Sequence, residues 1–266
     1  MIPPIAEIGR VKRAEEISPG LWDMAIAAPR ISTVTQAGQF AHVRVSEDFN
    51  PFLRRPLSIG PISGDDLRLI FHVRGEGTRL LAAKRPGDAV DLIGPLGHKI
   101  DVPAANNPLI FLTGGIGVVP LLTLDTQLPT SRKRIFILGV RSTRTIPVTL
   151  EEAVERKILW ASDDGSLGFH GNTVQLLQKV IDELDPNAKP LVIACGPGPM
   201  LKGMKQFCEK RSIPALVSLE VPMGCGVGAC QSCAVPKSDG SGYYLVCKDG
   251  PVFDAKDVSL EPGVLP

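Results

Sequence analysis

The stretch FLTGGIGVVPLL, residues 111–122, joins a short apolar run to three glycines and then to a second apolar run. A buried strand, a glycine turn and a helix start have this order, and a helix N-terminus there suits a pyrophosphate. The glycines Gly114, Gly115 and Gly117 do not have the G-x-G-x-x-G spacing of dinucleotide-binding turns. A tight strand-to-helix turn that binds nothing is therefore the alternative at this point.

Other short apolar runs of the buried, parallel type surround this turn, namely PLIFLTG, KRIFILGV, KILWAS and PLVIAC. Helix-like stretches lie between them: VVPLLTLDTQL, TLEEAVERK, GNTVQLLQKVIDEL and PMLKGMKQFCEKR. The alternation predicts a doubly wound α/β domain, which we place at residues 105–216. Residues 102–124 carry no charge, but their asparagines, glycines and prolines argue against a membrane span.

The first part of the chain has a different rhythm. Short runs such as QFAHVRV and LRLIFHV alternate apolar and polar residues and are separated by Pro, Gly and Asp. This pattern predicts an antiparallel β-barrel or sandwich over residues 1–104. From about Ala215 the sequence becomes rich in cysteine and glycine and is expected to be irregular to the end, which gives a third module at residues 217–266.

Bulk composition limits the partners. The chain has 266 residues, and its 29 basic and 28 acidic residues leave a net charge of +1, so we expect neither nucleic acid nor membrane as a partner. The start, MIPPIAEIGRVKR, lacks the apolar core of a secretory signal, and we expect a cytoplasmic protein. In that reducing compartment, clustered cysteines favour metal or redox roles over disulfides.

A second glycine turn lies in HVRGEGTRLLAAKRPGD, residues 72–88. Gly75, Gly77 and Thr78 precede a helix start that could hold a diphosphate. Upstream, LRRPLSIG (residues 53–60) sets an arginine pair, Arg54 and Arg55, before a strand. Such a pair is more often a solvated surface feature, but together the two segments indicate a flavin nucleotide site. The room for a diphosphate is the only direct argument for FAD over FMN.

Four cysteines form the most informative pattern of the chain: Cys225-x4-Cys230-x2-Cys233, followed after thirteen residues by Cys247. The plant-type [2Fe–2S] pattern is C-x4-C-x2-C with a distant fourth cysteine. Small residues between the first two cysteines let backbone amides turn toward the sulfurs and tune the reduction potential. Structural zinc, which usually takes two separated CxxC pairs, and disulfides are the alternatives. Cys208, in a helix-like stretch, is most simply a packing residue.

The chain resembles the ferredoxin–NAD(P) reductase superfamily. The matching pieces occur in the family's order: AGQF (37–40), RRPLS (54–58), GEGT (75–78), TGGIG (113–117) and CGPGPM (195–200). The resemblance implies a flavin-binding β-barrel and an α/β domain for the nicotinamide nucleotide. It places Arg55 and Ser58 of the Arg55-Pro56-Leu57-Ser58 motif on the flavin's pyrophosphate and isoalloxazine ring. Leu57 stands where relatives often have a stacking aromatic.

The resemblance also bears on the nicotinamide nucleotide. WASDDGSLG (160–168) occupies the place where relatives that use NADPH tend to offer Ser-Arg to the 2′-phosphate. Asp163 and its neighbour Asp164 would repel a phosphate and accept from a ribose hydroxyl, which favours NAD over NADP. The alternative is an ordinary Asp-Gly turn. Cys195 and Gly196 would lie near the nicotinamide; taken alone, Cys195 is a small buried thiol.

Within that superfamily, the compact cysteine module resembles the electron-transfer subunit of type B dihydroorotate dehydrogenase. SLEVPMGCGVGACQSCAV, VCKDGPVF and SDDGSLGFHG carry the likeness, although Val221-Pro222 stands where relatives often have a charged pair. The resemblance implies FAD, a [2Fe–2S] cluster and NAD as cofactors. It further implies an FMN-containing catalytic partner in a heterotetramer of two copies of each subunit, and a role in pyrimidine biosynthesis.

Three other functions stay open at this point. The chain could be an NAD(P)H-oxidising subunit for a hydrogenase, sulfur reductase or bifurcating transhydrogenase. It could be an oxygenase reductase, although such reductases carry a longer ferredoxin module. It could also be a zinc-stapled binding module without a redox role.

Overall fold

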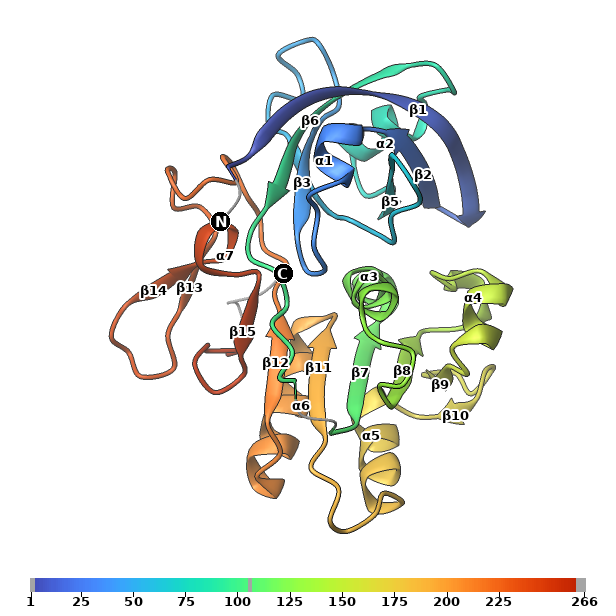
Figure 1. Ribbon diagram of the computed structural model, residues 1–266, viewed down its shortest axis with the longest axis vertical. Helices are drawn as coiled ribbons and strands as arrows, with labels where there is room; N and C mark the ends of the chain where they lie inside the picture. Colours follow the sequence, from blue (N-terminus) through green and yellow to red (C-terminus); the bar gives the residue numbers. More distant parts are fainter. Residues whose placement is uncertain (1–2, 105–106, 262–266) are drawn as a thin grey trace.

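The computed structural model describes residues 3–104 and 107–261, and it has three parts (Figure 1). A β-barrel lies above an α/β domain, and a small cysteine-containing module lies beside both. The predicted fold class, a β-barrel, a doubly wound α/β domain and a cysteine-rich module, is confirmed. The domain limits stay predictions, because the boundary at 104/105 and the outer ends at 1–2 and 262–266 touch or lie outside the described residues.

The barrel is a six-stranded antiparallel sheet with the order β4-β3-β6-β1-β2-β5. A bridge between Ile59 and Leu69 brings the end of β4 to β5 and nearly closes the sheet. Ala41 and Val43 of β3 point into the barrel core, whereas Phe40 belongs to the core on the outer side. The elements are β1 (Ile5–Ser18), β2 (Leu21–Ala27), α1 (Pro29–Ser32), β3 (Phe40–Arg44), β4 (Arg55–Ser58), β5 (Asp66–His72), α2 (Glu76–Ala82) and β6 (Ala89–Leu96).

The α/β domain is built on a seven-stranded sheet with the order β10-β9-β8-β7-β11-β12-β15. All neighbouring pairs are parallel except β12 with β15. Its strands are β7 (Leu109–Gly114), β8 (Arg134–Val140), β9 (Leu159–Ser162), β10 (Phe169–His170), β11 (Leu191–Cys195), β12 (Ala215–Ser218) and β15 (Val252–Asp254). Its helices are η1 (Gly115–Val118), α3 (Val119–Gln127), η2 (Thr143–Thr145), α4 (Leu150–Glu155), α5 (Thr173–Asp182) and α6 (Gly198–Arg211).

The order of the strands decides where a ligand can bind. From β7 the chain moves outward through β8 and β9 on one side, then returns to β11 and β12 on the other side. The strand order therefore reverses between β7 and β11, and ligands of such sheets bind beyond the carboxyl ends of the strands at that point. The glycine turn at residues 114–117 and the Cys195-Gly196 pair lie at these two ends.

The cysteine module is more regular than expected and shares structure with the α/β domain. It contains β13 (Ala234–Pro236) and β14 (Tyr243–Leu245), which form an antiparallel pair, and the short helix α7 (Val246–Asp249). Strand β15 pairs antiparallel with β12, and β12 itself runs past the predicted limit at residue 216. Phe40 and Leu96 of the barrel pack in one buried cluster with Cys233 and Cys247. The module is thus wedged between the two larger domains.

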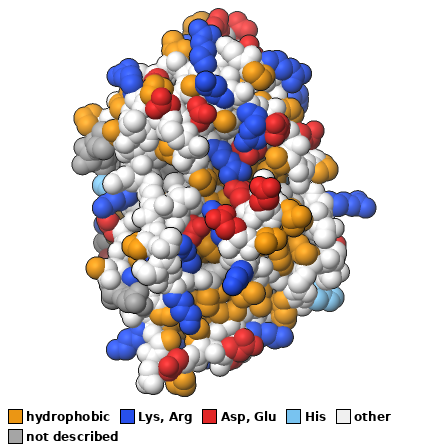
Figure 2. All heavy atoms as spheres, turned by 45° about the vertical axis from the view of Figure 1, so that its right-hand side comes forward, with side chains coloured by type: hydrophobic (Ala, Val, Ile, Leu, Met, Phe, Trp, Pro, Cys, Tyr) orange, Lys and Arg blue, Asp and Glu red, His pale blue; other side chains and the backbone are white. Residues whose placement is uncertain are grey.

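Two general surface features complete the fold. Basic and acidic side chains are interspersed over the face shown in Figure 2, with apolar side chains gathered on its lower half. Among the described residues, the helices are all too short or too polar to cross a membrane.

Candidate functional site

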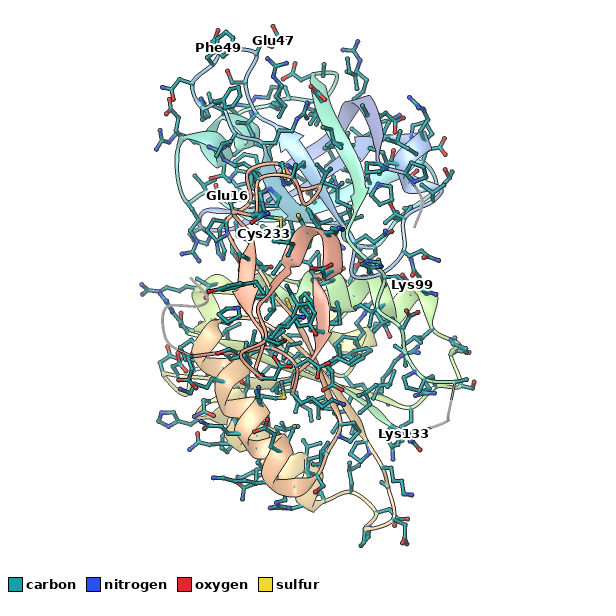
Figure 3. All side chains as sticks on the ribbon, turned by 90° about the vertical axis from the view of Figure 1, so that its left-hand side faces the viewer. Glu16, Glu47, Phe49, Lys99, Lys133 and Cys233 are labelled. Carbon is teal, nitrogen blue, oxygen red and sulfur yellow. The ribbon has the colours of Figure 1, made fainter. Side chains whose placement is uncertain are left out.

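The four predicted cluster ligands come together as two pairs of cysteines. The Cys233 and Cys247 sulfurs lie 3.2 Å apart. Cys225 and Cys230 form the other pair, in which the Cys230 amide donates to the Cys225 sulfur at 3.4 Å. Figure 3 places Cys233 where the module meets the lower edge of the barrel.

Backbone amides of the loop at residues 224–230, the cluster loop, point toward these sulfurs. The Val227 and Ala229 amides donate to the Cys225 sulfur at 3.4 and 3.3 Å. The Gly228 amide donates to the Cys247 sulfur at 3.1 Å and so links the two pairs. Gly226 and Gly228 have φ angles of +72° and +80°, which glycine adopts without strain. The glycines of the motif therefore let the loop fold around the sulfurs.

The pairing of the cysteines fits a binuclear cluster. A [2Fe–2S] cluster takes two ligands on each of two irons, and its sulfurs accept hydrogen bonds from amides. Two thiol pairs with inward amides supply what this group requires.

The two pairs differ in environment. Cys233 and Cys247 are buried, whereas Cys230 is exposed. In the metal-free chain, burial raises the pKa of Cys247 to about 12, and hydrogen bonds with Ser232 lower the pKa of Cys230 to about 6. One end of the site is therefore enclosed by protein and the other is open to the surroundings.

A cavity of about 280 Å³ lies where the three parts of the molecule meet. Pro56, Leu57 and Ser58 of β4 form its barrel side, and Ile116 and Val119 form its α/β side. The third side comes from the segment that leads into the cluster loop, residues 218–223. The cavity adjoins the predicted flavin motif and the cluster loop at once, which is the arrangement that electron exchange between two bound groups requires.

The two arginines at the predicted flavin site point to different partners. The guanidinium of Arg55 lies directly over Gly77, so that a Cβ built on Gly77 would be 2.5 Å from its Nε and Nη2 atoms. Arg54 turns away and pairs with Asp91, with 2.7 Å between Nη2 and Oδ2. Only Arg55 therefore joins the glycine turn. The Thr78 hydroxyl is engaged within that turn, where it accepts hydrogen bonds from the amides of Arg74 and Gly75.

The first glycine turn is packed against the end of β11. A Cβ on Gly117 would be 2.6 Å from the carbonyl carbon of Cys195 and 2.9 Å from the Gly196 nitrogen. Gly114 and Gly115 lie beside it, and Gly115 has a φ angle of +53°. Burial raises the pKa of the Cys195 thiol far above its ordinary range. This thiol is therefore a neutral, packed group at the strand end.

The two acidic residues after β9 also differ in their hydrogen bonding. The Asp164 carboxylate accepts from the Ser166 amide at 3.0 Å, and hydrogen bonding with Ser166 lowers its pKa. Asp163 is exposed at the carboxyl end of the sheet, and its amide donates to Val140. The Thr143 amide donates to the Ser166 hydroxyl at 3.2 Å and joins this turn to the loop after β8. Asp163 is thus the acid of the pair that is available to a ligand.

Sequence reasoning missed three residues at this junction. Phe40 and Glu220 line the cavity, and His42 packs on the cluster loop. Glu220 reaches solvent. Desolvation by the surrounding protein raises the pKa of its carboxyl group, whereas the charge of Arg74 acts to lower it. Glu220 follows β12, so its place at the carboxyl edge of a parallel sheet was a usable signal. The positions of Phe40 and His42 depend on which face of β3 points outward, and the sequence motifs do not show this.

Comparison with known proteins agrees with this site. Residues 220–259, which include all four paired cysteines, match the model of the iron-sulfur cluster binding domain of dihydroorotate dehydrogenase B. The dihydroorotate dehydrogenase B (NAD(+)), electron transfer subunit, of Desulforamulus reducens is 37% identical over 251 residues, covering 92% of this chain and 95% of that protein. The chain belongs to this family of electron transfer subunits. The subunit of Geobacillus kaustophilus is 38% identical over 247 residues, covering 90% and 93%.

Solved structures extend the likeness to the whole fold. An NADH-dependent reduced ferredoxin–NADP oxidoreductase, described for flavin-based electron bifurcation, has a TM-score of 0.84 at 25% identity and covers 96% of this chain and 90% of its own. A ferredoxin NADP+ reductase from Neisseria gonorrhoeae, with bound FAD and NADP, has a TM-score of 0.62 at 20% identity and covers 77% and 91%. The chain thus shares the fold of its two larger domains with ferredoxin reductases.

Proposed function

We propose that this chain is the electron-transfer subunit of an NAD⁺-linked dihydroorotate dehydrogenase. It passes electrons from the FMN of a catalytic partner subunit through a [2Fe–2S] cluster and FAD to NAD⁺. The observation that carries the proposal is the pairing of Cys225 with Cys230 and of Cys233 with Cys247 beside a cavity shared by all three parts of the molecule. Family membership over nearly the full length supports the same function.

When bound, these groups together convert between paired and single electrons, since NAD⁺ takes only a hydride and the cluster carries one electron at a time. The chain's own residues hold and enclose them. Arg55 and the turn at Gly75, Gly77 and Thr78 would take the FAD pyrophosphate. Pro56, Leu57 and Ser58 would border the isoalloxazine ring. The four cysteines would hold the cluster, with the buried Cys233 and Cys247 on one side and the half-buried Cys225 and exposed Cys230 on the other.

The nicotinamide nucleotide would occupy the carboxyl edge of the sheet. Gly114, Gly115 and Gly117 would let it approach the start of α3, with Cys195 and Gly196 beside the nicotinamide. Asp163 would accept from the adenosine ribose and repel a 2′-phosphate, so that NAD is preferred over NADP. Dihydroorotate itself would be oxidised in the partner, because the residues given roles here bind cofactors rather than that substrate.

The partner is an FMN-containing catalytic subunit, and the complex is a heterotetramer of two copies of each. It would act in pyrimidine biosynthesis in the cytoplasm. Val221 and Pro222, which precede the cluster loop, both line the cavity. This position therefore bears on the flavin environment as much as on the partner surface.

Co-expression with the catalytic subunit tests the proposal. The purified complex should contain FMN, FAD and two irons per copy of this chain, and it should reduce NAD⁺ with dihydroorotate. The catalytic subunit alone should oxidise dihydroorotate without reducing NAD⁺. The same assay with NADP⁺ should give a lower kcat/KM. A complex that loads all its cofactors but fails to couple dihydroorotate to NAD⁺ would contradict the proposal.

A second function is favoured by one observation, the TM-score of 0.84 to the bifurcating oxidoreductase. In that case the chain would serve a partner that exchanges electrons between NADH, NADP and ferredoxin. NADH-dependent reduction of a low-potential ferredoxin by the native complex, without activity on dihydroorotate, would establish it in place of the first.

A further inference from the structure

His42 is a buried polar side chain to which the function proposed above assigns no role. Only 1% of its surface is exposed. Its neighbours Ala41 and Val43 point into the barrel core, so His42 lies with Phe40 on the outer face of β3. That face is the one against which the cysteine module packs, at the junction seen around Cys233 in Figure 3.

The ring of His42 lies between the cavity and the cluster loop. Its Nε2 and Cε1 atoms are each 3.0 Å from the position that a Cβ would take on Gly226, the residue after Cys225. On its other side, the ring centroid is 5.9 Å from that of Phe40, which lines the cavity. One side chain of the barrel therefore contacts the wall of the flavin site and the backbone that holds the first cluster ligand.

Nε2 of His42 is buried and has no hydrogen-bond partner among the described residues. An unpaired buried polar atom costs free energy, whereas a leucine or phenylalanine would fill the same space without that cost. A histidine at this position is accounted for by a partner that becomes available when the site is loaded.

The hydrogen-bonding capacity of the ring limits what that partner can be. With no cluster bound, burial, helped by the nearby charge of Arg54, lowers the pKa of His42 to about 4. Arg54 itself is paired with Asp91, which leaves that carboxylate engaged. An imidazole has at least one N–H to donate in either charge state, and the sulfurs of an iron–sulfur cluster only accept.

We propose that His42 donates a hydrogen bond from Nε2 to a sulfur at the Cys225 end of the cluster. The bond ties the flavin barrel to the cluster loop. Because an N–H donor stabilises the more negative, reduced cluster, it also raises the reduction potential. This inference rests on the [2Fe–2S] site of the proposed function.

The wild-type chain allows a direct test. It is produced with ¹⁵N-labelled histidine, loaded with its cofactors and reduced, and the paramagnetic cluster is studied by pulsed EPR. A weak ¹⁵N coupling from a histidine ring nitrogen is expected, and it should disappear in labelled His42→Gln. A well-formed cluster signal without a histidine coupling overturns the inference, whereas the absence of any cluster signal or iron counts against the proposed function instead.

Matched variants test the effect on the potential in a redox titration followed by EPR. His42→Phe keeps a ring but removes the donor, and we expect about a tenfold shift toward the oxidised cluster, or about 59 mV lower for one electron. His42→Gln keeps an N–H donor and should stay closer to wild type. The control is His98→Phe, because His98 is exposed while its amide contacts Gly250 of the module. An unchanged potential in cluster-loaded His42→Phe overturns the inference; if that variant does not load, the labelling experiment decides.

Discussion

The two glycine turns look alike in the sequence, since each precedes a helix start, but they differ in what their glycines contact. At residues 114–117 the closest neighbour is a backbone group, because Gly117 packs directly against the carbonyl of Cys195. At residues 75–78 the critical neighbour is the tip of a flexible side chain, because Gly77 lies under the guanidinium of Arg55. The first turn is thus fixed by packing between strands, and the second is shaped around a charged group.

Replacing Gly117 by alanine should have the largest effect. The added Cβ would overlap the end of β11, where backbone cannot move aside, and we expect about 3 kcal/mol lower free energy of unfolding. Urea unfolding of the cofactor-free protein would measure it. A loss below about 1 kcal/mol would mean that the two turns are equally tolerant and that the contrast between them is wrong.

Gly77→Ala should act on flavin binding instead. The added methyl group would displace the Arg55 guanidinium, and we expect FAD affinity to fall about tenfold, in keeping with the loss of one charge-assisted hydrogen bond. The free energy of unfolding without FAD should rise by about 0.5–1 kcal/mol, because alanine is the better helix former. Titration of the apoprotein with FAD, alongside urea unfolding, would separate the two effects. Gly77→Ala should therefore weaken FAD binding while it raises the free energy of unfolding. Arg55→Ala should reproduce only the loss of FAD affinity.

Gly115→Ala tests the cost of the left-handed backbone conformation separately from any steric clash. Its φ angle is +53° and a Cβ there would meet nothing within 4 Å, so only the left-handed backbone opposes the change. We expect a loss of about 1 kcal/mol in the free energy of unfolding. A loss as large as that of Gly117→Ala would show that strain rather than close packing defines the first turn.

Gly75→Ser should have the smallest effect. Gly75 has an extended backbone, with φ −164°, at the N-cap of α2, and a Cβ there meets nothing within 4 Å. Serine is a good N-cap residue, so stability and FAD affinity should stay within about 0.5 kcal/mol of wild type. A tenfold loss of FAD affinity would instead show that a side chain at this residue obstructs the bound pyrophosphate.

Local pattern predicted most of the fold. The run over residues 111–122 becomes β7, η1 and α3, and the stretch PMLKGMKQFCEKR lies within α6. Those elements depend on apolar periodicity and on helix starts, which are visible in a single segment. Cys208 is buried beside Met204, as expected for a packing residue. Strand β15 was missed because its three residues are ordered by pairing with β12, a partner distant in the sequence.

The site was predictable where ligands are close in sequence and less so elsewhere. Cysteine spacing alone brought Cys225, Cys230 and Cys233 to one loop and pointed to Cys247. In contrast, Arg54 and Arg55 appeared as one pair although they reach opposite partners, Asp91 and the turn at Gly77. Neighbours on an extended backbone point to opposite sides, so adjacency in sequence does not mean a shared ligand. His42 was missed because its contact with Gly226 spans most of the chain.

Strand β15 has a consequence for how the protein is made. A ribosome must finish residues 252–254 before the edge of β12 can be covered. Until then the nascent α/β sheet exposes an unpaired strand edge, which is prone to wrong pairing with other chains. Iron delivery to the cysteine module and closure of the nucleotide sheet therefore concern the same late stretch of polypeptide. A chain cut before the cysteine module would lose this structural edge as well as a redox centre.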